Sequence, residues 1–462
     1  MTTRRRIAFV VFNDVYRDSR VLKTADSAVE AGFEARIFAF GGPLSRYPAG
    51  VEKRPSGAEI VRLAILPDRL PFMQGVVDRM RARHAARPAV IAPAVPAAAV
   101  PESEKPSAAP SQQSTPNTPS KPSVLAAAMA RFRRDRMRWV AELRAADFRR
   151  RAARSIRAWK PDLVHAHDAN TLEVAIDVQR RSGVPFVYDA HELWEERNAV
   201  RTPRQALAEK KLLDEASALM AGSITVSPGI QDWMTQRYQL RESPILVRNI
   251  PHARTQPASR DQGQLRALTG LTDDDKIVAY VGGITTGRGI DEAIAALAHL
   301  PNDVHLVLLG HGADEALKLF RALAAHHGVS DRVHFAGSVP SEQVSTAAAD
   351  ADVSLVFTQP KNLSYIHSLP NKLFESIHAG LPVVASKLPD VTALVTHYGV
   401  GELVEPDDIE AMAQAIGTVL ADSAAYRERS LQAAQELTWQ GEMARLHELY
   451  DAVQSEPERR VQ

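Results

Sequence analysis

The segment Leu369–Ser386, with the sequence LPNKLFESIHAGLPVVAS, combines residue types that could bind a nucleotide. The polar step Asn371-Lys372 leads into a short helix that carries Glu375, and Gly380 ends this helix before a buried strand begins. The free N–H groups of a helix start and the Lys372 ammonium suit a phosphate, and the Glu375 carboxylate could accept both hydroxyls of a ribose. Taken alone, an ordinary helix–strand joint with a surface lysine and glutamate explains the segment equally well.

Two glycine-rich turns follow predicted strands in the same half of the chain. Gly282-Gly283 precedes Arg288, and Gly310 and Gly312 flank a histidine. Paired glycines allow the backbone to approach a phosphate closely, and a guanidinium can neutralise a diphosphate through two N–H groups. The motifs GxxxxGK[ST] and GxGxxG are absent. The turns therefore support a phosphate site of another kind.

Polar clusters also follow strands in the first half of the chain. They are Asn13 and Asp14 with Arg20, then His165, His167 and Asp168, and then Asp189 and His191. We interpret His165 as a buried structural residue, and we take His167, Asp168 and His191 as catalytic candidates because strand ends face the ligand in parallel sheets. His–Asp pairs are also typical of metal sites, but no third ligand with convincing spacing is found, so we expect no metal.

The composition of the 462 residues bounds the possible functions. The net charge of +1 gives no general attraction to nucleic acid, and the absence of cysteine excludes disulfides and thiolate chemistry. Apolar runs fall short of the roughly twenty residues that span a bilayer, and the N-terminal run IAFVVF is too short for a signal peptide. We expect a cytoplasmic enzyme.

Strands and helices are predicted to alternate along both halves, which indicates an α/β protein with parallel sheets. We expect two tandem doubly wound, Rossmann-like domains that face each other across a cleft. The predicted boundaries are 1–252, 253–438 and a C-terminal helix in 439–462. We interpret the polar stretch that ends near Leu271 as the interdomain linker.

Two segments interrupt the alternation in the first domain. Residues 84–124 are rich in proline, alanine and serine, and we expect a disordered insertion. A helix follows at about 126–159, with eleven arginines against three acids between Arg131 and Arg157. It is either a solvated helix, packed through the stripe Met129, Phe132, Trp139 and Leu143, or a helix that binds an anionic membrane surface. RNA binding is a weaker alternative, because the aromatic residues are not interleaved with the charges.

These motifs together resemble the family 4 nucleotide-sugar-dependent glycosyltransferases, which have the GT-B fold. The resemblance covers nearly the whole chain outside the insertion. It rests on NDVYRDSRVLKTA, HAHDANTL, YDAHELWEE, ITVSPGI, LVRNIP, YVGGITTGRG and PNKLFESIHAGLPVVAS. Each motif is a modest signal, but their order and spacing together are specific.

The resemblance implies a site for a nucleoside-diphosphate sugar. The donor diphosphate would contact the Gly282-Gly283 turn, Arg288 and Lys372, with Asn371 beside them, and Glu375 would hold the ribose. By similarity, His167 would lie close to the transferred sugar and the acceptor. Asn13, Asp14 and Arg20 would lie on the acceptor side. The last helix would cross back to the first domain, and the family retains the anomeric configuration without a metal.

Two positions depart from the family pattern. His367 stands where the family has the first glutamate of its Glu-x7-Glu signature, which addresses the sugar. Gly283 stands in the position of the family's donor-binding arginine, and Arg288 replaces its lysine. Lys372 could supply the missing charge. We therefore include His367 among the donor-site candidates and expect it to influence sugar specificity.

The predicted function is transfer of a hexosyl unit from a nucleoside-diphosphate sugar to a hydroxyl of a lipid-linked, cell-envelope or exopolysaccharide acceptor. No cofactor and no nucleic acid are expected. The enzyme could also attach peripherally to the inner face of an anionic membrane. Two alternatives remain: a sugar-nucleotide epimerase of the same fold, which needs no acceptor, and a non-catalytic binding protein, which His367 favours.

Overall fold

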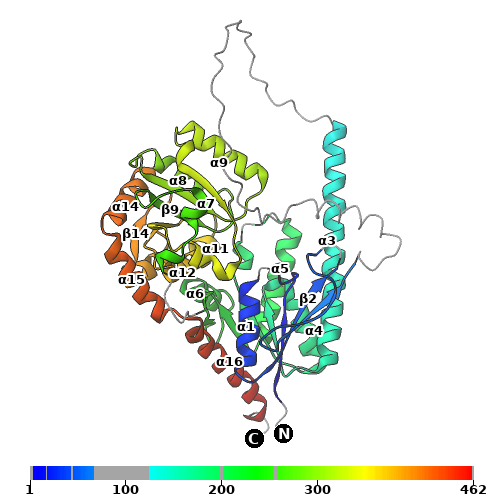
Figure 1. Ribbon diagram of the computed structural model, residues 1–462. Helices are drawn as coiled ribbons and strands as arrows, with labels where there is room; N and C mark the ends of the chain where they lie inside the picture. Colours follow the sequence, from blue (N-terminus) through cyan, green and yellow to red (C-terminus); the bar gives the residue numbers. More distant parts are fainter. Residues whose placement is uncertain are drawn as a thin grey trace.

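The computed structural model describes residues 4–16, 18–42, 45–66, 124–197, 199, 201–252 and 259–459. Its described residues form two α/β domains, each built on one sheet (Figure 1). Residues 84–123 of the predicted disordered insertion lie outside the described residues.

The first domain contains an eight-stranded sheet with the order β3-β4-β2-β1-β5-β6-β7-β8, in which β3 alone runs antiparallel to its neighbour. Its strands are β1 (Arg6–Val10), β2 (Glu34–Gly41), β3 (Gly50–Lys53), β4 (Glu59–Ala64), β5 (Leu163–His167), β6 (Phe186–Ala190), β7 (Gly222–Thr225) and β8 (Ile245–Leu246). Its helices are α1 (Ser19–Glu30), α3 (Val124–Trp159), α4 (Leu172–Ser182), α5 (Pro203–Leu219) and α6 (Pro228–Arg237). Every residue of β5 and β6 is buried, as expected for central strands covered by helices on both faces.

The second domain contains a six-stranded parallel sheet with the order β11-β10-β9-β12-β13-β14. Its strands are β9 (Lys276–Val281), β10 (Val304–Leu309), β11 (Val333–Gly337), β12 (Val353–Val356), β13 (Val383–Ser386) and β14 (Gly401–Val404). Its helices are α7 (Leu265–Thr269), α8 (Ile290–Leu297), α9 (Asp314–His326), α10 (Val344–Ala347), α11 (Leu363–Ile366), α12 (Asn371–His378), α13 (Pro389–Tyr398), α14 (Ile409–Ala421) and α15 (Ser423–Glu436). The parallel sheets confirm the predicted fold class, two Rossmann-like domains in tandem.

The polar stretch before Leu271 is not all linker, which corrects the prediction. It contains α7, whose Leu265 is fully buried in the core of the second domain. The Asp350 carboxylate accepts hydrogen bonds from the backbone N–H groups of Leu265 and Arg266. The helix was missed because a single buried leucine gives a five-residue helix almost no periodic signal.

The last helix, α16 (Trp439–Arg459), leaves the second domain and packs on the first sheet beside α1 (Figure 1). Trp439 and Tyr450 are among the largest fully buried side chains, and they contact the same core cluster as Phe9. Burial of each such side chain contributes about 1.5–3 kcal/mol. The chain therefore passes between the domains again before its end.

Burial in α3 differs from the predicted apolar stripe. Phe148, Ile156 and Trp159 pack on the first domain, whereas Trp139 is 61% exposed and Leu143 38% exposed. Met129 and Phe132 lie outside the residues whose side chains are described. The N-terminal part of α3 projects away from the first sheet (Figure 1). Trp139 and Leu143 of the predicted stripe therefore do not attach α3 to the domain.

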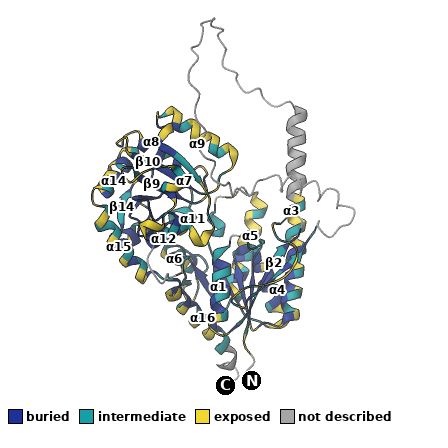
Figure 2. Ribbon diagram, viewed as in Figure 1, coloured by how far each residue is buried: buried dark blue, intermediate teal, exposed yellow. Residues whose placement is uncertain are grey.

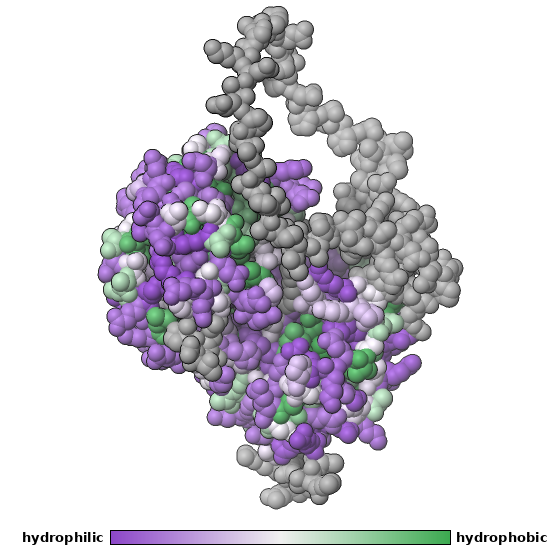
Figure 3. Space-filling view, in the orientation of Figure 1, coloured by the Kyte–Doolittle hydropathy of each residue, from purple (hydrophilic) through white to green (hydrophobic). Residues whose placement is uncertain are grey.

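The two cores are apolar and the outer surface is polar. Figure 2 shows the central strands of both sheets as buried, with exposed residues on the outward faces of the helices. The described surface in Figure 3 is largely hydrophilic, with scattered hydrophobic residues. No helix in the described part of the chain has both the length and the apolar character that crossing a bilayer requires.

Candidate active site

A cavity of about 740 Å³ lies between the two domains, at the carboxyl ends of both sheets. The first domain contributes residues that follow β1, β6 and β7, and the second contributes residues that follow β9 and β12 and the start of α12. The lining includes Asn13, Asp14, Asp18, Arg20, His191, Glu192, Tyr280, Gly282, Gly283, Arg288, Ser364, Tyr365, Ser368, Asn371, Lys372 and Glu375. Most of the sequence-predicted site residues thus meet in one cavity.

The start of α12 opens into this cavity. Pro370 precedes the helix in an extended conformation, and no side chain caps its N-terminus. Leu373 and Phe374 anchor the opposite face of the helix in the core. Gly380, with φ +67°, reverses the chain after the helix, as the sequence predicted. The free N–H groups and the positive helix end therefore face the space that a ligand would occupy.

Lys372 reaches the cavity from within the core, since it is only 6% exposed. Its Nζ donates to the backbone oxygen of Phe357 at 2.6 Å and lies 4.7 Å from the ring centre of Tyr280. Burial, and then the charge of Arg288, lower the pKa of Lys372 to about 7. A bound anion would raise the pKa of Lys372 again, because it would stabilise the charged ammonium.

Glu375 lies one helical turn after Lys372 and lines the same cavity. Burial raises the pKa of Glu375 to about 7, against the opposing charges of Lys23 and Lys372. Lys23 belongs to α1 of the first domain, and its Nζ donates to the Ile250 oxygen at 2.6 Å. Burial and the charge of Arg20 lower the pKa of Lys23 to about 7. Cations of both domains therefore surround one carboxylate.

The glycine-rich turn after β9 forms the adjoining part of the cavity. Gly282 has φ +127°, which only glycine adopts without strain, and a Cβ on Gly310 would lie 1.7 Å from the Gly282 oxygen. Arg288 follows this turn, with its guanidinium carbon 5.8 Å from the ring centre of Tyr365. Gly283 is exposed and has no atom within 4 Å of a hypothetical Cβ. The turn therefore leaves open space beside Arg288.

His367 does not line the cavity, which corrects the expectation that it faces the donor. Its Nδ1 lies 3.4 Å from Oδ2 of Asp390, and its backbone oxygen accepts from the Ser227 hydroxyl. The reason is local: His367 ends α11 and points towards the first domain, whereas Tyr365 and Ser368 line the cavity. No sequence signal distinguished these directions, because α11 is a single turn.

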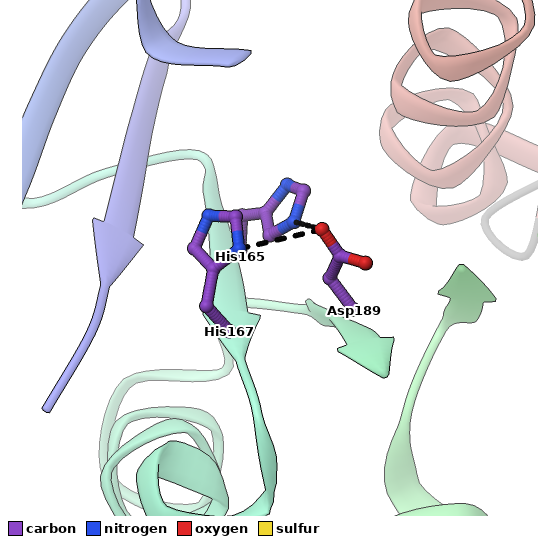
Figure 4. Close-up of side chains that lie close together, drawn as sticks. All are labelled: His165, His167 and Asp189. Atoms are coloured by element: carbon purple, nitrogen blue, oxygen red, sulfur yellow. Dashed lines mark hydrogen bonds and ion pairs between the residues drawn. The ribbon is translucent and has the colours of Figure 1, made fainter. Parts of the chain in front are cut away.

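Figure 4 shows His165 and His167, which project from β5 towards Asp189 of β6. The ring nitrogens His165 Nε2 and His167 Nδ1 each lie 3.3 Å from Asp189 Oδ2. Arg20 of α1 holds the same carboxylate with two hydrogen bonds, of 2.9 and 2.7 Å. The hydroxyl of Tyr450 lies 2.6 Å from His165 Nδ1. We call His165, His167, His191, Asp168, Asp189 and Arg20 the histidine cluster.

His167 is fully buried inside this cluster, so the prediction that it reaches the cleft is wrong. Its ring stacks on that of His165 at 4.2 Å, and its Nδ1 lies 3.1 Å from His191 Nε2. Burial, and then the charge of His165, lower the pKa of His167 well below its usual value. The strand alternation puts both histidines on one face, and His191 occupies the position between His167 and the cavity.

His191 is the histidine of the cluster that lines the cavity. Its Nδ1 lies 3.4 Å from Asp168 and its Nε2 3.5 Å from Asp189. Burial opposes its charge, but the two carboxylates raise the pKa of His191 to about 9. Asp168 itself does not line the cavity; its backbone has φ +60°, a strained conformation for a residue with a Cβ. Asp168 therefore holds His191 rather than a ligand.

The histidine cluster also supplies the third potential metal ligand that the sequence did not reveal. Ligand atoms of His165, His167 and Asp189 lie within 4.8 Å of one another. However, both oxygens of Asp189 already accept hydrogen bonds from Arg20. Burial would raise the pKa of Asp189, but the charges of Arg20 and His191 outweigh it and hold this pKa well below its usual value. A divalent cation would have to displace a buried guanidinium. The donor set therefore fits a charge network better than a metal site.

The predicted acceptor-side residues line the cavity, but their side chains form hydrogen bonds with other groups of the protein. Asn13 donates to Asp18 at 2.8 Å and accepts from the Val15 N–H at 2.8 Å. The Asp14 carboxylate accepts from the N–H groups of Tyr16 and Arg46. Arg20 also donates to the Val247 oxygen at 2.7 Å. These residues therefore organise the loop after β1.

Sequence reasoning missed several residues of the cavity. Tyr280 and Tyr365 line it beside the cations of the second domain. Lys23 of α1 does not line the cavity, but its charge acts on Glu375. Lys23 lies one turn after Arg20, so it shares a face of α1 with a residue that lines the cavity. Tyr280 lies inside a buried strand, where it gives no signal of its own.

Two family descriptions match the chain. The description "Glycosyl transferases group 1" matches residues 261–437, in the second domain. The description "Glycosyltransferase Family 4" matches residues 109–248, in the first domain. Together the two ranges cover more than half of the 462 residues.

Two curated proteins illustrate the similarity in sequence. The D-inositol 3-phosphate glycosyltransferase of Mycolicibacterium smegmatis is 30% identical over 295 residues, which are 60% of this chain and 64% of that protein. The glycogen synthase of Mycobacterium tuberculosis is 27% identical over 292 residues, 61% of this chain and 66% of that protein. The alignments therefore span slightly less than two thirds of these relatives.

Solved structures resemble the chain over nearly its whole length. Sucrose-phosphate synthase of Thermosynechococcus elongatus has a TM-score of 0.65 at 17% identity and covers 97% of this chain and 99% of its own. HepE of Anabaena, in complex with UDP, has a TM-score of 0.62 at 16% identity and covers 97% and 100%. These likenesses establish the two-domain GT-B fold that the resemblance implied.

Proposed function

The chain belongs to the group 1 and family 4 glycosyltransferases, and from this premise we propose that it transfers a hexosyl unit from a nucleoside-diphosphate sugar to a hydroxyl group. The observation that carries the proposal is the convergence of Arg288, Lys372 and the uncapped start of α12 beside Glu375 in one cavity. Positive groups for a diphosphate and a carboxylate for a ribose thus lie one helical turn apart. The UDP complex of the similarly folded HepE supports a donor of this class.

The proposed mechanism depends on the charge that develops on the leaving diphosphate. Arg288, Lys372 and the N–H groups of α12 would stabilise that charge from fixed positions, which is the main requirement for departure of a nucleoside diphosphate. These cations would take the role that a metal has in other transferases, and we propose that no metal is needed. The Glu375 carboxylate would accept the ribose hydroxyls.

His191 would act from the opposite side of the cavity. Its ring is held between Asp168 and Asp189 and faces the space next to the proposed donor site. The two domains would exclude water from this space, because attack by water would hydrolyse the donor. We propose retention of anomeric configuration, as in the family, with the acceptor hydroxyl entering between His191 and the sugar.

The donor is identified by binding and the reaction by its products. We expect one nucleoside-diphosphate sugar to raise the melting temperature of the protein, because a ligand that binds only the folded state stabilises it. Incubation with that donor and a panel of lipid-linked and oligosaccharide acceptors should give a larger glycoside. Formation of an isomerised nucleotide sugar or free sugar without acceptor would instead indicate an epimerase. Absence of turnover with a bound donor would indicate a binding protein.

We further propose that the acceptor is a lipid-linked or cell-envelope saccharide and that α3 attaches the enzyme to an anionic membrane surface. The exposed Trp139 and Leu143 and the excess of arginine along the helix support this proposal. The protein should sediment with anionic liposomes, and not with neutral ones, at low salt. Equal sedimentation with both kinds of liposome, or binding that is insensitive to salt, would contradict the electrostatic attachment.

A further inference from the structure

The two domains contact each other at a second place, next to the cavity. The first domain contributes Ser227 and Gly229 at the start of α6, and the second contributes His367 and Asp390. We call these four residues the interdomain contact. In Figure 1, α6 lies at the boundary between the domains, close to α12. This contact has no role in the donor chemistry described above, since His367 and Asp390 do not line the cavity.

The hydrogen bonds of this contact join the domains directly. The Gly229 N–H donates to Asp390 Oδ1 at 2.9 Å, and the Ser227 hydroxyl donates to the His367 oxygen. Asp390 lies in the first turn of α13 and is 8% exposed, so its carboxylate is a buried group that accepts from the helix start of the other domain. A carboxylate at a helix N-terminus is favourable because the free N–H groups and the helix dipole both attract it.

His367 completes the contact from the side of the second domain. Its Nδ1 lies 3.4 Å from Asp390 Oδ2, and within the described residues neither atom has a hydrogen-bond partner elsewhere. Two buried polar atoms that face only each other form a pair whose separation would leave both without a partner. His367 is therefore coupled to the first domain through Asp390.

Gly229 makes this approach possible. A Cβ at Gly229 would lie 2.0 Å from His367 Nδ1 and 2.5 Å from Asp390 Oδ2. Gly229 lies in the first turn of α6 and has no positive φ, so its backbone conformation is one that alanine also adopts. A side chain there would have to displace the His367 ring and the Asp390 carboxylate, whose atoms are the nearest to it, or separate the two domains.

The segment that the contact holds is part of the cavity. It runs from Asn362 to Pro370, and its Ser364, Tyr365 and Ser368 line the cavity. At its other end, the Leu193 N–H of the first domain donates to the Ser364 hydroxyl at 3.2 Å. The segment is thus attached to the first domain on both sides of Tyr365 and leads directly into α12.

From these contacts we propose that Asp390 is a positioning residue, which acts through His367 and Gly229 to fix the relative orientation of the two domains and to hold segment 362–370 against the donor. The proposal rests on the proposed function for the identity of that donor. The departure at His367 from the family's glutamate then has a structural meaning: the residue joins the domains instead of contacting the sugar.

The test measures the distance between the domains and the binding of UDP separately. The chain has no cysteine, so spin labels on Lys211→Cys and Lys318→Cys, both exposed positions, report the interdomain distance. We expect Gly229→Ala and Asp390→Ala to shift or broaden the distance distribution and to weaken UDP binding about tenfold, with circular dichroism unchanged. Asp390→Asn keeps an acceptor for the Gly229 N–H. It should therefore retain most of the wild-type distance distribution and most of the UDP affinity.

Gly417→Ala is the matched control. Gly417 lies in the exposed face of α14, and a Cβ there would meet nothing within 4 Å, so neither readout should change. Distance distributions of Gly229→Ala and Asp390→Ala that equal the wild type would overturn the positioning role, and so would shifted distances with unchanged UDP affinity. A wild-type protein that binds no nucleoside diphosphate would refute the proposed function, while the distances would still decide whether Asp390 orients the domains.

Discussion

The two sides of the cavity handle their charges in opposite ways. On the first-domain side, the histidine cluster is internally compensated: Asp189 is paired with Arg20 at 2.7 Å, and His191 lies between two carboxylates. On the second-domain side, Arg288 and Lys372 contact tyrosine rings and a backbone oxygen, and no ion pair joins either to a carboxylate within the described residues. The protein itself compensates the charges on the first-domain side, and on the second-domain side we propose that a ligand does so.

This difference indicates where the ligand charge belongs. Burial raises the pKa of Glu375 and lowers the pKa of Lys372, so both groups are destabilised in their charged forms until something binds. Unfavourable desolvation of this kind is typical of functional sites. On the other side, the pKa of His191 is raised because its partners are already present. We therefore expect the second-domain side to determine donor affinity, whereas the first-domain side holds His191 between two carboxylates.

The largest effect is expected on the second-domain side. Arg288→Ala should lower kcat/KM for the donor about 10²–10³-fold, because one of the groups that stabilise the leaving diphosphate is lost. Steady-state kinetics with the identified donor measure this, with Lys318→Ala, an exposed lysine of the same domain, as the control. Unchanged kinetics would remove Arg288 from the donor site.

On the first-domain side, the two neighbouring histidines should behave differently. His191→Ala should lower kcat about 10²-fold and leave UDP affinity nearly unchanged, because His191 belongs to the first domain, whereas the proposed diphosphate site belongs to the second. His167→Ala should instead cost about 2–4 kcal/mol of unfolding free energy, because it empties a fully buried site. Urea denaturation and kinetics of both variants separate the two roles. A catalytic defect in His167→Ala without loss of stability would reverse the assignment.

The pH dependence of UDP binding should report the second-domain side. Lys372 must be charged to bind a diphosphate, and its pKa of about 7 means that binding above pH 7 takes up a proton, so affinity falls by up to about tenfold per pH unit. Glu375 must be ionised to accept the ribose hydroxyls, and its pKa of about 7 weakens binding below pH 7.

Calorimetry across the pH range tests this prediction with two variants. Lys372→Arg should remove the alkaline decline, and Glu375→Gln should remove the protein's part of the acid decline. The comparison between wild type and variant cancels the titration of the nucleotide phosphate itself. Parallel profiles in all three proteins would show that neither residue contacts the ligand.

The smallest effect is expected where α16 meets the histidine cluster. Tyr450→Phe removes the hydroxyl that lies 2.6 Å from His165 Nδ1 and should lower the free energy of unfolding by about 1 kcal/mol, with kcat unchanged. Chemical denaturation and kinetics measure the two quantities. A marked fall in kcat would show that the histidine cluster depends on α16 for its catalytic geometry.

Much of the fold was predictable from the sequence. The apolar runs at Leu163–His167 and Val353–Val356 predict strands, and the structure has β5 and β12 over the same ranges. The helix α12 ends just before Gly380, as expected, because buried apolar runs and left-handed glycines are local signals. The hairpin β3–β4 was not predicted. Every residue of β3 is exposed, so no apolar alternation marks it, and only its pairing with β4 makes it a strand.

The sequence predicted which loops form the candidate site, but not which of their side chains face it. Lys372, Glu375, Arg288 and His191 all line the cavity, because the carboxyl ends of parallel strands meet at one edge. His167 and His367 were assigned to the cavity and lie outside it. Residue type and strand position placed them near the cleft, but the direction of each side chain depends on its neighbours in space.

The sequence by itself determined the chemistry available to this protein: the glycine-rich turns, the cations and carboxylates at strand ends, and the alternation that makes two parallel sheets. Only the tertiary structure decided which charges are compensated. Arg20 and Asp189 are 169 residues apart, and His367 meets Gly229 across a domain boundary. Such pairings depend on how distant segments pack, and burial then sets the protonation of each group, so no local pattern could reveal them.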